Sequence, residues 1–171
     1  DHDPDGLIFV PLEDAERVLS GKYTPKPLIL RANVGDWLEV TLHNMWKCPV
    51  PYFDYPKVPL DLRHKPSSRV SLNPQFLQYD PICDSGYNHK EQTVGIGESK
   101  RYLWKADREY GSCILQSFGD MRNHRYHGLF GAVIVEPAGA QWYENFTKRK
   151  NPFAEQEVIT APGMESFREF V

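Results

Sequence analysis

The feature that most constrains the fold of this sequence is a regular alternation of residue types between positions 37 and 43. Leu38, Val40 and Leu42 occupy every second position, and Glu39 and Thr41 lie between them. Successive side chains of a β-strand point to opposite faces of a sheet, so a period of two predicts a strand with one buried face. A helix would instead need apolar residues three or four positions apart.

Other short apolar segments, separated by turn-forming residues, predict more strands. The chain has 14 prolines and 12 glycines among its 171 residues, which is typical of many short strands joined by turns. We expect strands at residues 7–10, 28–31, 69–72, 99–106, 111–118 and 129–135, and one short helix at residues 14–19. Five prolines predict a long loop at residues 45–67. The pattern predicts a two-sheet, all-β sandwich with less than about a tenth of its residues in helix.

Composition and charge exclude several classes of protein. The formal net charge is -3 and the longest basic run covers residues 148–150, so the sequence does not indicate a nucleic-acid partner. No apolar stretch approaches the roughly 18 residues of a membrane span. The cysteines, Cys48, Cys83 and Cys113, lack metal-type spacing. We interpret Cys113 as a buried thiol, while pairing between the two loop cysteines stays open.

Three segments carry a resemblance to a known family. Residues 27–36 read P-L-I-L-R-A-N-V-G-D, residues 92–98 read Q-T-V-G-I-G-E, and residues 127–137 read H-G-L-F-G-A-V-I-V-E-P. In this order they resemble the multicopper oxidases, in particular the large bacterial group that includes manganese(II) oxidases. The resemblance extends from about residue 3 to residue 143. It implies an all-β fold of the cupredoxin-like Greek-key β-sandwich type.

The resemblance also implies a setting and an activity for the parent protein. It implies an extracytoplasmic location (secreted, periplasmic or at the cell surface) and copper as cofactor. The implied reaction is oxidation of a metal ion such as Mn(II), or of a phenol-like substrate, with reduction of O2. The expected partners are this substrate and other cupredoxin domains of the same protein or of another chain. We expect residues 1–147 to form the cupredoxin-like domain and residues 148–171 to form a linker and the first strands of a following domain, so that the chain is a fragment.

The copper ligands of that family are missing from this sequence. A trinuclear copper centre takes its imidazoles from H-x-H pairs, because residues i and i+2 of a strand share one face. No H-x-H occurs here, and the corresponding positions read Asn73-Pro74-Gln75 and Gln116-Ser117-Phe118. Cys113 also lacks the nearby histidine of a blue-copper site. We therefore expect this domain to be a copper-free scaffold within the parent oxidase, whereas a secreted structural or binding sandwich without copper chemistry is the alternative.

One cluster of metal-ligating residue types remains, formed by Asp120, His124 and His127. These residues predict a site for a substrate cation or an accessory copper, provided that the segment turns, since on a strand the two histidines would face opposite ways. In the competing structural interpretation, Asp120 caps a turn and His127 hydrogen-bonds to backbone. The sequence leaves both open.

Overall fold

The computed structural model describes residues 3, 6–47, 67–150 and 156–170. Short strands dominate this part of the chain, and its two α-helices, α1 (Ala15–Leu19) and α2 (Met121–Tyr126), contain five and six residues. The strands are β1 (Leu28–Asn33), β2 (Trp37–His43), β3 (Asn73–Pro74), β4 (Gln78–Tyr79), β5 (Ser99–Lys105), β6 (Gly111–Gln116), β7 (Phe130–Glu136), β8 (Gln141–Glu144), β9 (Gln156–Thr160) and β10 (Phe167–Phe170).

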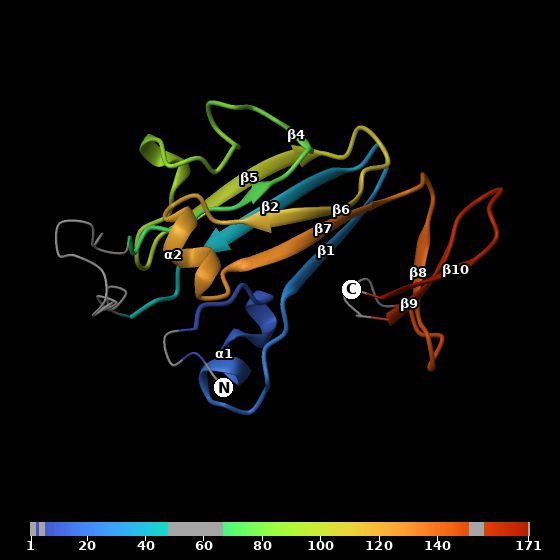
Figure 1. Ribbon diagram of the computed structural model, residues 1–171, viewed down its shortest axis with the longest axis horizontal. Helices are drawn as coiled ribbons and strands as arrows, with labels where there is room; N and C mark the ends of the chain where they lie inside the picture. The colour runs from blue at the N-terminus through green and yellow to red at the C-terminus, as the bar shows by residue number, and fades with distance from the viewer. Residues whose placement is uncertain (1–2, 4–5, 48–66, 151–155, 171) are drawn as a thin grey trace.

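Two sheets form the sandwich (Figure 1). One has the strand order β1-β7-β6-β3, with β1 parallel to β7, and the other has the order β2-β5-β4 with antiparallel pairs. A single apolar core draws on both sheets, and Leu115, Val133, Tyr102 and Trp104 are each 0% exposed within it. The expected all-β sandwich of two sheets around one core is confirmed.

The alternation of apolar and polar residues in the sequence correctly predicted the strands that face this core. In β2, Leu42 is buried and Leu38 and Val40 pack against the core, while Trp37, Glu39, Thr41 and His43 are exposed. In β5, Tyr102 and Trp104 lie on the same buried face. The expected helix is also confirmed as α1, and Gly21 follows it with φ of 69°, a left-handed conformation that favours glycine at a helix end.

Two of the expected strands are wrong. Residues 7–10 form no strand, although Phe9 is buried, and Leu7 N donates to His127 O at 2.6 Å. Residues 69–72 contain only one bridge, from Val70 to Val94. There the amide of Ser71 donates to the Ser117 hydroxyl instead of to a neighbouring strand, because a polar side chain competes with the sheet for backbone groups.

The last three strands form a separate small sheet in the order β10-β9-β8, drawn in orange to red in Figure 1. Ile159 is 0% exposed and, with Ala140 and Ala161, belongs to a small apolar cluster of its own. β8 lies before residue 147 and β9 after it, so this sheet joins segments on both sides of the expected domain boundary. The division at residue 147 stays a prediction.

Among the described residues, no helix is long and apolar enough to cross a lipid bilayer.

Candidate functional site

The positions that the resemblance assigns to copper ligands lie side by side in the sheet. β3 and β6 pair antiparallel, and Asn73 lies directly opposite Gln116. Residues in such opposite positions point to the same face, with Cβ atoms about 5 Å apart. The side chains at positions 73 and 116 therefore lie close enough to approach one common ligand.

The side chains at these positions make other contacts. Asn73 is 4% exposed, and its Nδ2 donates to Ser85 O at 2.6 Å. The ring of Phe118 packs edge to face against Tyr87, with centroids 5.1 Å apart. Gln75 is exposed and Gln116 is half-buried. Amides are poor copper ligands and a phenyl ring is none, so this donor set does not fit a share of a trinuclear copper centre.

Asp120, from the predicted metal cluster, begins helix α2. Its Oδ1 accepts from Asn123 N at 3.1 Å, and its Oδ2 accepts from Asn123 Nδ2 at 2.7 Å and from Ser67 N at 3.0 Å. Burial alone would raise the pKa of the Asp120 carboxyl, but these hydrogen bonds to the ionised form outweigh it and lower the pKa. The carboxylate thus caps α2 and fixes Ser67 to it.

His124 is fully buried, and both of its ring nitrogens have partners. Nε2 lies 2.8 Å from Ser67 O, and a carbonyl only accepts, so Nε2 carries the proton. Nδ1 lies 2.9 Å from the Ser117 hydroxyl oxygen. That oxygen already accepts from the amides of Ser71 and Gly119, so its own proton is directed to Nδ1. The lone pair that a metal ion would need is therefore engaged in a hydrogen bond.

His127 lies at the other end of α2 and has a different partner. Its Nδ1 is 2.6 Å from Asp3 Oδ2, whereas the structural interpretation of the sequence expected a bond to backbone. The turn that the metal interpretation required forms as α2, but the three side chains have separate partners. In the described ranges, no group of three His, Cys, Asp or Glu side chains is arranged to hold a metal ion. Metal binding by Asp120, His124 and His127 stays a prediction.

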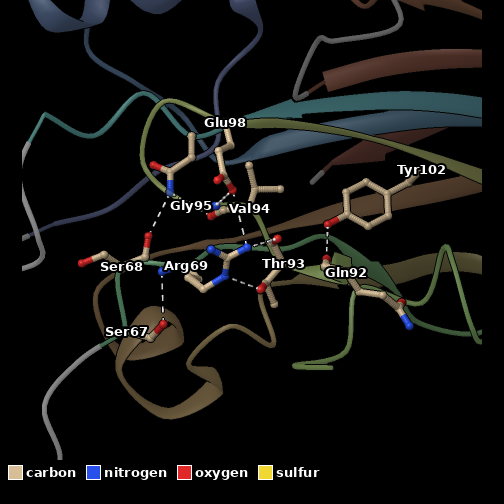
Figure 2. A network of polar contacts seen from close by, with 10 residues as sticks. Ser67, Ser68, Arg69, Gln92, Thr93, Val94, Gly95, Glu98 and Tyr102 are labelled. Carbon is tan, nitrogen blue, oxygen red and sulfur yellow. Dashed lines mark hydrogen bonds and ion pairs between the residues drawn. The ribbon is translucent and has the colours of Figure 1, made fainter. Parts of the chain in front are cut away.

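A second polar network, around Arg69, was missed by sequence reasoning (Figure 2). Arg69 Nε donates to Thr93 Oγ1 at 2.8 Å and Nη2 donates to Thr93 O at 2.7 Å. Glu98 lies 3.5 Å from Arg69 Nη2 and accepts from Gly95 N. Residues 92–98, one of the three segments that resemble multicopper oxidases, thus bind Arg69 in the segment that begins at Ser67. The only sign of this network in the sequence was the segment of residues 92–98, which contains both Thr93 and Glu98.

The neutral state of His124 predicts a loss of stability in acid. Burial, the dominant cause, lowers the pKa of His124 below its ordinary value of 6.5, although the Ser67 carbonyl and Asp120 partly oppose this. The unfolded chain therefore binds more protons below pH 6.5, and stability falls as the pH drops from there toward the lowered pKa. Denaturant midpoints measured from about pH 7.5 to about pH 5.5 should decline more steeply for the wild type than for His124→Gln. Parallel declines would show that His124 contributes no pH dependence.

Comparisons with known proteins find similarity in structure. No family model and no curated protein matches this sequence. A multicopper oxidase from Pseudomonas thermotolerans is similar at 19% identity over 68% of this chain and 23% of its own, with a TM-score of 0.48. A copper nitrite reductase from Nitrosomonas europaea is similar at 20% identity over 66% of this chain and 32% of its own (TM-score 0.43).

Lac15, from a marine microbial metagenome, is similar at 18% identity over 80% of this chain and 34% of its own, with a TM-score of 0.45. The chain thus spans between 23% and 34% of the length of these three proteins. At such identities the likeness concerns the fold and not the chemistry.

Proposed function

We propose that this chain is a cupredoxin-like domain of a multidomain, copper-dependent oxidase, and that it acts there as a scaffold without a copper site of its own. The observation that carries the proposal is the register of Asn73 opposite Gln116. Two neighbouring strands hold the family's ligand positions in place, but amides stand where imidazoles are needed. The resemblance of residues 3–143 to multicopper oxidases supports the rest of the proposal.

An exposed apolar surface supports the scaffold role. On the outer face of β6, Ile114 is 51% exposed, and on neighbouring β7, Phe130 is 41% exposed. Phe130 lies opposite Gln116 in the register, so this apolar surface adjoins the positions that the resemblance assigns to copper ligands. Apolar patches of this kind commonly mark contact sites. We propose that another cupredoxin domain packs on this face.

The parent protein would carry the chemistry. Copper bound by its other domains would oxidise a metal ion such as Mn(II), or a phenol-like compound, and pass the electrons to O2. This assignment, and an extracytoplasmic location, rest on the sequence resemblance. The alternative is a secreted structural or binding sandwich without copper chemistry, which the same amide residues also fit. Copper bound by the parent protein would favour the oxidase domain, and its absence there would favour the sandwich without copper chemistry.

The packing role predicts a large effect of Ile114→Asp in the parent protein. Burying a carboxylate in a domain contact costs several kcal/mol, so Ile114→Asp should loosen the packing of the neighbouring domain. The backbone amides of β6 and β7 should then exchange hydrogen faster, and oxidase activity should fall about tenfold or more. Leu103→Asp is the matched control, since Leu103 is 41% exposed on the outer face of the other sheet. It should leave both measurements near wild type. Equal effects of the two changes would exclude a contact at Ile114.

A further inference from the structure

A large cavity lies at the side of the sandwich where the two edge strands β1 and β2 meet. Its volume is about 510 Å³. Leu28 and Leu30 of β1 line one wall and Val40 and Leu42 of β2 line another. The segment of residues 6–12 and helix α1 form a third wall, drawn in blue beside these strands in Figure 1.

The cavity is open to solvent on one side, since Leu12 and Leu19 of its lining are 59% and 60% exposed. The cavity lies within the range of about 300–1,000 Å³ that small-molecule sites occupy. An apolar cavity of about 150 Å³ already holds benzene, so this one has room for roughly three such rings.

The lining determines which ligand chemistry fits. The described lining residues are mostly aliphatic and aromatic, and none of them is Asp, Glu, Lys or Arg. A carboxylate or phosphate would therefore be buried here without a permanently charged partner, which is costly. The polar members include Asn44, whose Nδ2 already donates to Ser68 O and Val94 O, and whose Oδ1 accepts from Trp46 N. A neutral ligand with few polar atoms fits this lining best.

The size of the site also argues against a protein partner. A stable interface buries about 800 Å² on each side, and the surface lining this cavity is far smaller. We propose that the cavity is a binding site for a neutral, largely apolar compound about the size of two to three six-membered rings, held between β1, β2 and the N-terminal segment. This inference does not depend on the proposed copper oxidase.

The test titrates the full chain with N-phenyl-1-naphthylamine, a neutral three-ring fluorophore. We expect saturable, one-to-one binding with a micromolar Kd, and slower hydrogen exchange at residues 7–12 but not in β8–β10. Val18→Trp, on the α1 wall, should fill the cavity and weaken binding by about tenfold or more. Leu30→Phe tests the β1 wall in the same way. Leu103→Trp, at an exposed position outside the cavity, is the control and should stay within about twofold of wild type.

Several results would overturn the proposal. Absence of saturable binding would do so, as would equal affinity in the wild type and in a folded Val18→Trp or Leu30→Phe variant. Hydrogen exchange on the wild type needs no variant, so unchanged exchange at residues 7–12 with bound probe would place the probe elsewhere. A concentration-dependent dimer that excludes the probe would show that a second copy fills the cavity.

Discussion

Replacing Glu136 by Gln is expected to lower the free energy of unfolding by about 3–5 kcal/mol, because it removes the negative charge from a buried ion pair. Arg31 Nη1 lies 3.1 Å from Glu136 Oε1, and the two side chains are 0% and 5% exposed. Arg31 belongs to β1 and Glu136 to β7, which pair in parallel. The ion pair therefore links two neighbouring strands in a place that water does not reach.

The double variant Arg31→Met, Glu136→Gln should be more stable than Glu136→Gln alone, since it removes both charges of the buried pair. The exposed pair of Arg101 and Glu39 gives a matched control, because its side chains are 69% and 60% exposed. Glu39→Gln should cost less than about 1 kcal/mol. Denaturant unfolding at neutral pH measures the wild type, the double variant and the single variants Glu136→Gln, Arg31→Met and Glu39→Gln. Strictly additive losses in the double variant would show that the two groups do not act as a pair.

Replacing His124 by Ala is expected to cost about 3–5 kcal/mol and to leave the copper content of the chain unchanged. The change removes a fully buried ring and leaves the Ser67 carbonyl and the Ser117 hydroxyl without their partner, at about 1–3 kcal/mol each. His89→Ala, at an exposed histidine, should stay within about 0.5 kcal/mol of wild type. Denaturant unfolding and elemental analysis provide the two measurements.

A metal role for the cluster would give a different result. If copper were held by Asp120, His124 and His127, the double change His124→Ala, His127→Ala would abolish copper uptake that the wild type shows. A wild-type chain that takes up copper, together with a double variant that takes up equally much, would place the metal elsewhere. We expect no uptake by either protein, because both nitrogens of His124 are engaged.

The sheets were predictable wherever burial alternates along a strand. Residues 37–43 and the pair Tyr102 and Trp104 show their buried face directly in the sequence. Residues 7–10 are apolar and Phe9 is indeed buried, but apolar character encodes burial and not strand pairing. The same limit applies to β7, where Phe130 points outward from an almost wholly apolar run.

The candidate site was predictable only in its residue types. The metal interpretation required a turn between His124 and His127, and helix α2 supplies that turn. Their partners could not be foreseen, because Ser67 lies 57 residues before His124 and reaches it only through the fold. Likewise, the lack of imidazoles at Asn73 and Gln116 was visible in the sequence, but their direct opposition in the sheet was not.

The most direct test of the scaffold assignment is copper content, measured by elemental analysis on this chain alone and on the longer protein that we propose contains it. Both samples are purified, saturated with copper and desalted side by side. The scaffold role predicts copper in fixed proportion in the longer protein and none retained by the isolated chain. Stoichiometric copper on the isolated chain, or none in the longer protein, would contradict it.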